Sequence, residues 1–227
     1  MGGPGRLLAE GRASEVFDLG DGTVLRRSKQ GSDYRREAAV MRHALAAGLP
    51  VPRVRSVEGP EIVLDRIDGP TMLDDLVRHP WRLGAHARLL AALHARVHAV
   101  AAPAAAATAP MPGDRLLHLD LHPANVLLSP TGPVLIDWEN AAAGDPAFDL
   151  AVTWVLMDGA DAAGSRVELA AIAAFRRAFL AVWLRRVGRA EAARGLAAAA
   201  EMRAADRNAT PAEGDRARAL AARHGAP

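Results

Sequence analysis

Three oxygen-bearing side chains lie close together in the middle of this 227-residue chain. Asp120 is followed five residues later by Asn125 and, twelve residues after that, by Asp137. One carboxylate of such a set can orient and deprotonate an attacking hydroxyl. An amide oxygen and a second carboxylate can hold Mg²⁺ against phosphates, because Mg²⁺ prefers hard oxygen ligands. The set therefore predicts Mg²⁺-dependent phosphoryl transfer from ATP.

The residues between Asn125 and Asp137 are typical of a β-hairpin. Two short apolar runs, 125–128 and 133–136, flank Ser-Pro-Thr-Gly, which is a turn sequence. A hairpin returns the chain to its starting edge, so we expect Asn125 and Asp137 to meet at one edge of a cleft.

The ordered set of motifs resembles the aminoglycoside phosphotransferase family, which has the protein-kinase-like fold. The resemblance rests on His118–Asn125, on Asp137 and on the run Gly-Asp-Pro-Ala-Phe-Asp-Leu-Ala at 144–151, and it covers about residues 8–157. Protein kinases share a similar His-x-Asp-x-x-x-x-Asn loop. Trp-Glu at 138–139 departs from the Phe-Gly of protein kinases and is similar to the small-molecule branch.

The resemblance implies a role for each residue of the central motif. Asp120 would be the catalytic base, and Asn125 and Asp137 would be the Mg²⁺ ligands. His118 would brace the loop without transferring protons, and His122 would have a structural or substrate-edge role.

The resemblance also implies an ATP-binding N-terminal region. Gly11 and Ser14 occupy the place of the glycine-rich loop that covers the phosphates, although the segment has one glycine. Arg26 stands where the family has the lysine that contacts the α- and β-phosphates, and arginine can also bind phosphate with its fork of N–H donors. Glu37, in the following helix, is predicted to pair with Arg26.

Residues 62–67, Ile-Val-Leu-Asp-Arg-Ile, would form the last strand of this region and the hinge that follows it. Adenine would bond to the backbone of Asp65 and Ile67, with Leu64 at the back of its pocket.

The predicted fold class is α+β, a two-lobe protein-kinase-like fold with a small β-rich N-lobe at 1–67 and a mainly helical C-lobe at 68–227. In the N-lobe, an Asp-Gly pair at 21–22 indicates a hairpin. A helix is expected over 32–47 with Ser32 as its N-cap, and two strands after it.

In the C-lobe, helices are expected at 71–79, at 84–100 and from about 147 onward. The Ala/Pro-rich segment 101–114 is predicted to be a flexible loop. The polar tail after Arg207 is predicted to fray. Apolar runs around Trp154, Phe175, Phe179 and Trp183 favour core packing for these aromatic side chains.

A small hydroxyl-bearing acceptor is favoured, because only eleven residues separate Asp137 from Asp149 and leave little room for a peptide platform. The family resemblance suggests an aminoglycoside, with a nucleoside, macrolide or peptide natural product as alternatives. His122, Glu139, Asp145 and Asp158 are the predicted substrate contacts. A polycationic acceptor would need an acidic pocket. Candidate acids for that pocket are Glu139, Asp145, Asp158, Asp161, Glu201 and Asp206.

Two further classes stay open. The chain could be a non-catalytic binding subunit that keeps the fold, which the arginine at position 26 and the single glycine would fit. A protein kinase acting on Ser or Thr is less favoured, because of the short segment after Asp137.

Composition excludes other classes. Cysteine is absent, so disulfides and thiolate catalysis are excluded, and a cytoplasmic location is expected. The pI of 9.8 accompanies a net charge of only +2 and arises from 27 arginines, so no nucleic-acid partner is predicted. No transmembrane run is found, and oligomeric state stays open. His94 and His98 lie one helical turn apart, but without a third ligand they favour packing over metal binding.

Overall fold

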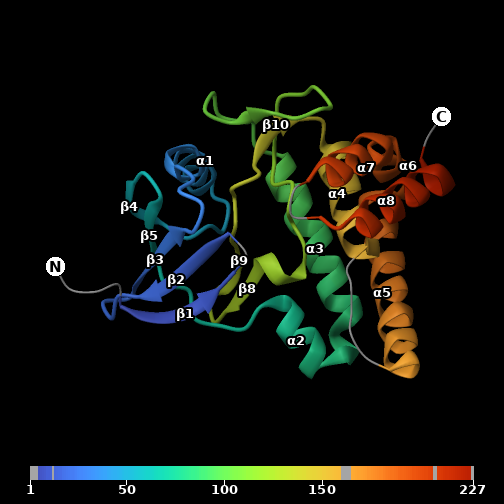
Figure 1. The fold of residues 1–227 in the computed structure, drawn as a ribbon, viewed down its shortest axis with the longest axis horizontal. Helices are drawn as coiled ribbons and strands as arrows, with labels where there is room; N and C mark the ends of the chain where they lie inside the picture. Colours follow the sequence, from blue (N-terminus) through green and yellow to red (C-terminus); the bar gives the residue numbers. More distant parts are fainter. Residues whose placement is uncertain (1–4, 12, 160–164, 207–208, 226–227) are drawn as a thin grey trace.

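The computed structural model describes residues 5–11, 13–159, 165–206 and 209–225. Figure 1 shows a strand-rich lobe beside a larger helical lobe, which confirms the predicted α+β, two-lobe architecture. A hairpin of two strands lies between the lobes.

The N-terminal lobe is an antiparallel five-stranded sheet with one helix, α1 (Arg35–Ala46). Its strands follow the order β1-β2-β3-β5-β4 in the sheet. Their bounds are β1 Arg6–Glu10, β2 Ser14–Asp18, β3 Thr23–Ser28, β4 Val54–Glu58 and β5 Glu61–Asp65. The predicted β2–β3 turn contains two glycines with positive φ, and the Asp18 and Asp21 carboxylates accept backbone N–H bonds within it.

The helix α1 begins three residues later than its sequence predicts. Ser32 is not the N-cap; instead the backbone N–H of Ser32 donates to Ser28 Oγ. The carboxylate of Asp33 accepts from the backbone N–H of Arg35, the first helical residue. The Asp33 side chain therefore satisfies a donor that the predicted cap was expected to serve.

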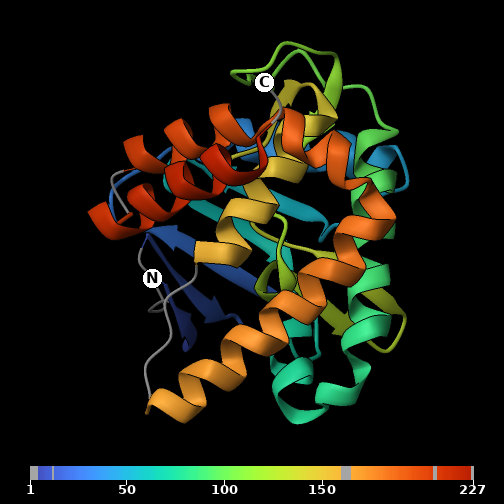
Figure 2. The same cartoon turned by 90° about the vertical axis from the view of Figure 1, so that its right-hand side faces the viewer.

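The helical lobe is built around α4 (Pro146–Gly159), in which ten of fourteen residues are buried. A helix that is apolar all round must be covered on every side. The surrounding helices are α3 Leu83–His98, α5 Arg166–Val187, α6 Arg189–Arg194, α7 Leu196–Ala205 and α8 Pro211–His224. The short helix α2 (Met72–Arg78) begins at a capping box formed by Thr71 and Asp74 and leads through a 3₁₀ turn at Pro80–Arg82 into α3. Figure 2 shows α7 and α8 lying across the upper end of α4, and the first half of α5 extending beyond the lobe.

Two C-lobe predictions were wrong. The segment 101–114 is not a free loop, because β6 (Ala107–Thr108) pairs in parallel with β10 (Ala142–Gly144), which also pairs with β7 (Arg115–Leu117). Beyond Arg207 the chain forms α8, whose Thr210–Glu213 capping box starts the helix and whose Leu220 is buried. The segment is polar in overall composition, but α8 has a narrow apolar face that packs against α4 and α7.

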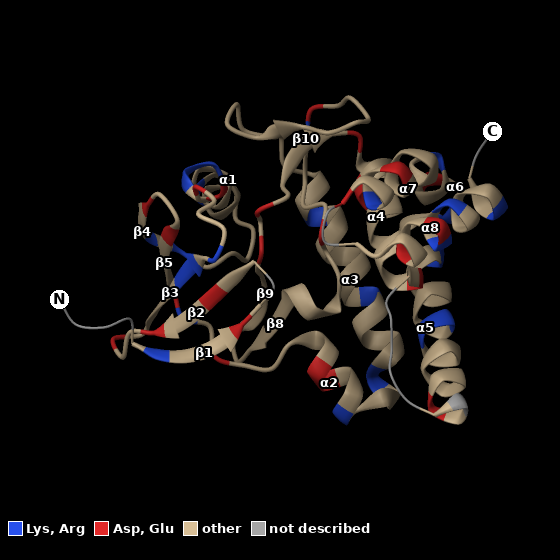
Figure 3. Ribbon diagram, viewed as in Figure 1, with Lys and Arg blue, Asp and Glu red and all other residues tan. Residues whose placement is uncertain are grey.

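The four predicted core aromatic residues include three that are fully buried, Trp154, Phe179 and Trp183, whereas Phe175 is partly buried. Lys/Arg and Asp/Glu residues are scattered over both lobes (Figure 3), in agreement with the small net charge.

Candidate active site

The loop that carries the predicted catalytic residues, named the catalytic loop below, runs from β7 through His118–Leu121 to the 3₁₀ turn Pro123–Asn125. Its sharpest point is Leu119, whose φ of 61° is rare for a side chain without a local hydrogen bond. The buried carboxylate of Asp149, on α4, accepts the backbone N–H groups of His118 at 3.2 Å and Leu119 at 2.7 Å. This carboxylate holds the loop in its strained conformation.

Asp149 is itself held in the charged form. Burial opposes its ionisation, but the hydrogen bond from His98 Nε2 at 2.8 Å and the neighbouring imidazoles hold the pKa of Asp149 below its usual range. In the sequence, Asp149 was noted only as part of the run at 144–151 that resembles the family. Its hydrogen bonds to the loop are seen only in the structure.

Asp120 projects from this loop and is partly exposed, with its side chain 24% accessible. Asn125 Nδ2 donates to both the carbonyl oxygen and Oδ2 of Asp120, each at 2.9 Å. His122 Nε2 lies 3.4 Å from Asp120 Oδ1. Because Ala124 N–H donates to His122 Nδ1, the neutral imidazole carries its proton on Nε2, facing the carboxylate.

The predicted hairpin, β8 (Val126–Ser129) and β9 (Gly132–Leu135), brings the second acid to the same place. Ile136 N–H donates to Asn125 O, so Asp137 follows directly beside Asn125. Asp137 has a φ of 65°, and it and Leu119 are the two non-glycine residues with positive φ in the described part of the chain. The next residue, Trp138, is fully buried, which fixes the strand end.

The buried His118 supports both segments. Its Nε2 lies 3.1 Å from Ile136 O, and its ring packs 4.6 Å from that of Trp138. Burial lowers the pKa of His118, so the ring is neutral and serves as a brace, as the sequence predicted.

The oxygen atoms present fit a Mg²⁺ ion. Asn125 uses its amide nitrogen toward Asp120, which leaves its Oδ1 as an acceptor. Asp137 binds Arg26 through Oδ1 alone, and Oδ2 receives no hydrogen bond from the residues that the structure describes. Two protein oxygens suffice for Mg²⁺ when phosphates and water complete its octahedron.

Arg26, on β3, is the centre of a buried ion cluster and pairs with Glu37 as predicted, with a distance of 2.7 Å between Nη1 and Oε1. Its Nη2 also donates to Asp137 Oδ1 at 3.0 Å and to Glu139 Oε2 at 3.1 Å, and its Nε donates to Ser14 Oγ at 3.2 Å. Asp137 and Glu139 are more than a hundred residues from Arg26 along the sequence, and their contacts with it were not predicted.

Charge in this cluster is unevenly shared. Burial, reinforced by the carboxylates of Asp137 and Glu139, raises the pKa of Glu37 to about 7 despite the adjacent arginine. Burial also opposes the charge of Arg26, but Glu37 and then Asp137 raise its pKa above its usual value. Arg26 therefore stays charged while Glu37 titrates near neutrality.

The remaining predicted nucleotide contacts lie around the same sheet. Gly11 and Ser14 flank the β1–β2 turn, where Gly11 N–H donates to Ser14 O. Leu64 and Asp65 end β5, next to the connection to the helical lobe. Ile67 N–H makes no backbone hydrogen bond within the described chain, so it is available as a donor at the predicted hinge.

An open cavity of about 540 Å³ borders the catalytic loop at His122, Pro123 and Ala124. Its wall is largely apolar and comes from α2, α4 and α5. The apolar lining residues outside the loop are Leu73, Leu76, Val155, Leu156, Met157, Ile172, Phe175 and Phe179.

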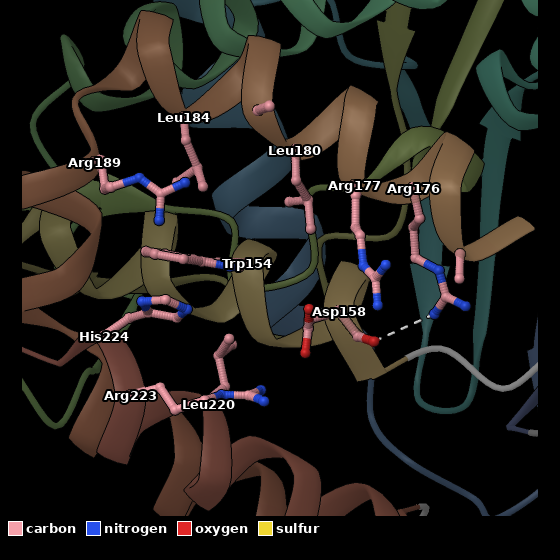
Figure 4. Close-up of a pocket in the computed structure, with 12 residues that line it drawn as sticks. Trp154, Asp158, Arg176, Arg177, Leu180, Leu184, Arg189, Leu220, Arg223 and His224 are labelled. Atoms are coloured by element: carbon pink, nitrogen blue, oxygen red, sulfur yellow. Dashed lines mark hydrogen bonds between the residues drawn. The ribbon is translucent and has the colours of Figure 1, made fainter. Parts of the chain in front are cut away.

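Of the predicted substrate contacts, only His122 lies at this cavity. Glu139 belongs to the Arg26 cluster, and Asp145 pairs with Arg194 and accepts from the first turn of α4. Asp158 lines a second cavity on the other side of α4 (Figure 4).

The other candidate acids are also not placed in the first cavity. Glu201 pairs with Arg218, and Asp206 pairs with Arg203. Asp161 lies outside the described residues.

His94 and His98 pack as predicted. His94 is buried and contacts Leu90 O and Thr153 Oγ1, while His98 binds Asp149. Thr153 Oγ1 also donates to Leu121 O, which links α3 and α4 to the catalytic loop. Among the described residues no group of three His, Asp or Glu side chains is arranged to hold a metal.

Comparison with known proteins assigns the family. The sequence model described as the phosphotransferase enzyme family matches residues 5–114 and 104–193, most of the chain. The chain belongs to this family. The predicted resemblance and the expectation of an enzyme of the small-molecule kinase type are thereby confirmed.

Solved structures share the fold at low sequence identity. A choline/ethanolamine kinase family protein from Mesorhizobium loti is 20% identical with a TM-score of 0.63, covering 98% of this chain and 91% of that one. The gentamicin complex of APH(2")-IIa is 15% identical with a TM-score of 0.64, covering 88% and 81%. A thermostable mutant of the aminoglycoside phosphotransferase APH(4)-Ia, bound to AMP-PNP and hygromycin B, is 18% identical with a TM-score of 0.58, covering 97% and 93%.

Curated relatives match over a short segment. Thiamine kinases from Shigella boydii and Salmonella paratyphi B are each 51% identical over 39 residues. That match spans 17% of this chain and 14% of each relative. No helix in the described ranges combines the length and apolar character needed to cross a bilayer.

Proposed function

We propose that the chain is an ATP- and Mg²⁺-dependent phosphotransferase that transfers the γ-phosphate to a hydroxyl group of a small molecule. The observation that carries this proposal is the joint placement of Asp120, Asn125 and Asp137 at one loop edge, with Asp149 fixing the loop. Residues 1–67 would bind the nucleotide, and residues 68–227 would supply catalysis and the acceptor site.

Asp120 is the proposed catalytic base, because it is the partly exposed carboxylate closest to the cavity-lining His122. It would accept the proton of the acceptor hydroxyl, while the Asn125 amide and the His122 Nε2–H hold its two oxygens in position. Asn125 Oδ1 and Asp137 would hold Mg²⁺, which when bound screens the charge of the phosphates.

Arg26 would contact the nucleotide phosphates, and the ion pair with Glu37 would keep the Arg26 guanidinium oriented. To do so Arg26 must exchange its bonds to Asp137 and Glu139 for phosphate oxygens, which frees Asp137 for the metal. Gly11 and Ser14 would cover the phosphates, and Leu64, Asp65 and Ile67 would bound the adenine.

The cavity beside His122 supports an acceptor with an apolar, uncharged body better than a polycationic aminoglycoside. Among the described residues of its wall Glu213 is the one carboxylate, and it accepts hydrogen bonds from Arg203 at 2.9 Å and from the Thr210 backbone. The Thr210 backbone bond and Arg203 lower the pKa of Glu213.

Exposed apolar residues extend the same wall outward. Leu73 is 47% and Ile172 is 40% accessible, at the outer edges of α2 and α5. An acceptor with a broad apolar face, such as a macrolide-like compound, would bury this surface. Each Å² of apolar surface removed from water would contribute roughly 25 cal/mol to the binding free energy.

The alternative function is nucleotide binding without turnover. The observation that favours it is the bond from Arg26 to Asp137, because this arginine occupies one oxygen of the predicted metal ligand. Both functions predict ATP binding, so phosphate transfer decides between them.

The test is Mg²⁺-dependent ATP consumption with mass spectrometry for a phosphate adduct. The acceptor panel contains macrolides, nucleosides, thiamine, choline, gentamicin and hygromycin B. We expect the phosphate adduct on a compound with a broad apolar face, such as a macrolide. ATP binding with no adduct on any acceptor would favour the non-catalytic alternative.

The matched variants are Asp120→Asn and Asp114→Asn. Asp114 is a strongly exposed acid just before β7, paired only with its neighbour Arg115. Asp120→Asn should reduce transfer by at least about a hundredfold while ATP still binds, and Asp114→Asn should retain it. Full activity of Asp120→Asn would refute the assignment of the base.

A further inference from the structure

A second cavity, of about 420 Å³, lies between α4, α5, α6 and α8, and no residue of the catalytic loop lines it. Figure 4 shows an apolar lining, with Leu180 and Leu184 on the α5 side, Leu220 on the α8 side and Trp154 between them. The proposed phosphotransfer reaction uses no part of this cavity.

The rim of this second cavity is strongly basic. Four arginines line it, Arg176, Arg177, Arg189 and Arg223, and Asp158 is the one carboxylate among the described lining residues. Without counting His224, the described lining carries a net charge of three positive units. Like charges around one cavity repel, so an anion placed among them offsets that repulsion.

Three of these guanidinium groups are available to a ligand. Within the described chain, Arg177, Arg189 and Arg223 form no ion pair with a carboxylate, whereas the arginines of the Arg26 and Arg203 clusters are paired with acids. Figure 4 shows Arg189 next to Trp154 and Arg177 extending from α5 toward Asp158.

Trp154 contacts a guanidinium group and an imidazole ring at the edge of the cavity. The guanidinium of Arg189 lies 5.2 Å from its ring centre, and the imidazole of His224 stacks on it at 5.5 Å with an angle of 23°. Contact with an aromatic face restrains an arginine without neutralising its charge. The indole, only 3% exposed, is therefore a built-in reporter of what binds there.

We propose that this cavity is a binding site for a small oxyanion with at least two negative charges, separate from the acceptor cavity. Guanidinium groups bind phosphate and carboxylate oxygens through paired N–H donors, and several converging arginines favour a multivalent ligand over chloride. The apolar lining would accommodate a short carbon skeleton attached to the anionic group.

The probe is inorganic pyrophosphate, titrated at constant ionic strength without Mg²⁺, with tryptophan fluorescence and calorimetry as readouts. We expect saturable binding and a fluorescence change. Trp154→Phe should lose that change but keep the calorimetric binding.

The decisive variant is the double substitution Arg177→Gln with Arg223→Gln. Both side chains are exposed, so folding should be unaffected. The matched control is Arg185→Gln with Arg186→Gln, which removes the same charge from exposed positions of α5 outside the cavity. The lining variant should bind pyrophosphate at least about tenfold more weakly, and the control should bind it within about twofold of the parent.

Three results would overturn the proposal. The first is no saturable binding of pyrophosphate. The second is binding that the lining variant leaves unchanged, which would place the anion in the nucleotide cleft near Arg26. The third is equal weakening by both double variants, which would show an effect of overall charge.

Discussion

Replacing His94 by glutamine should change how the stability of the protein depends on pH. His94 is 1% exposed, and burial lowers its pKa from 6.5 to about 4. Below pH 6.5 the unfolded chain binds a proton at this imidazole, while the folded chain does not until about pH 4. Protons in that window therefore favour unfolding, so stability is lost as the pH falls from 6.5 to 4.

The magnitude follows from the width of that window. Each unit of pKa difference corresponds to about 1.4 kcal/mol, so His94 alone removes about 3 kcal/mol of unfolding free energy across it. Glutamine is an uncharged side chain that can contact Leu90 O and Thr153 Oγ1, but it does not titrate. Between pH 4 and 6.5, the free energy of unfolding should therefore depend on pH less steeply in the variant than in the parent, by about 1.4 kcal/mol per pH unit.

The assay is urea denaturation at fixed pH values between 4.5 and 6.5, with the free energy of unfolding taken by linear extrapolation. Subtracting the variant from the parent removes the contributions of all other titrating groups. The control is His43→Gln, a half-buried histidine bonded to Ala101 O. Parallel stability curves for the parent and His94→Gln would refute the reasoning, even if the variant is less stable throughout.

Three further perturbations have expected outcomes. Glu37→Gln should remove a pH dependence of stability whose sign is opposite to that of His94. Burial raises the pKa of Glu37 to about 7, so the free energy of unfolding of the parent falls as the pH rises from 4.5 to 7. The variant should lack this slope in the same urea titrations. Gly69→Ala should lower the free energy of unfolding by at least about 2 kcal/mol, because φ is 147° and the added Cβ would lie 2.2 Å from Leu128 O. Thr153→Val should lower kcat and cost about 1–3 kcal/mol of stability, because the Leu121 carbonyl loses its donor.

Each of these has a matched comparison. Glu61→Gln removes a half-exposed acid paired with Arg27 and is the control variant for the same urea titrations. Gly20→Ala has a positive φ of 82° but open space around it, so a loss equal to that of Gly69→Ala would argue against the clash. Thr153→Ser retains the hydroxyl and should restore most of the activity; failure of this rescue would contradict the role of the hydrogen bond.

Local sequence determined much of this protein. The Asp-Gly turn, the hairpin after Asn125 and the spacing from Arg26 to Glu37 each depend on residues near one another in the chain, and the structure contains all three. Turn chemistry and apolar periodicity are local properties, so they can be recognised without the fold.

Tertiary structure decided which charges meet. The bonds from Arg26 to Asp137 and Glu139, and the hold of Asp149 on the catalytic loop, join residues far apart in sequence. Of the acids that composition offered for a polycation, Glu139, Asp145 and Glu201 are likewise paired with arginines from other elements. A sequence shows which charges exist, but whether a carboxylate is available depends on the cation that the fold places beside it.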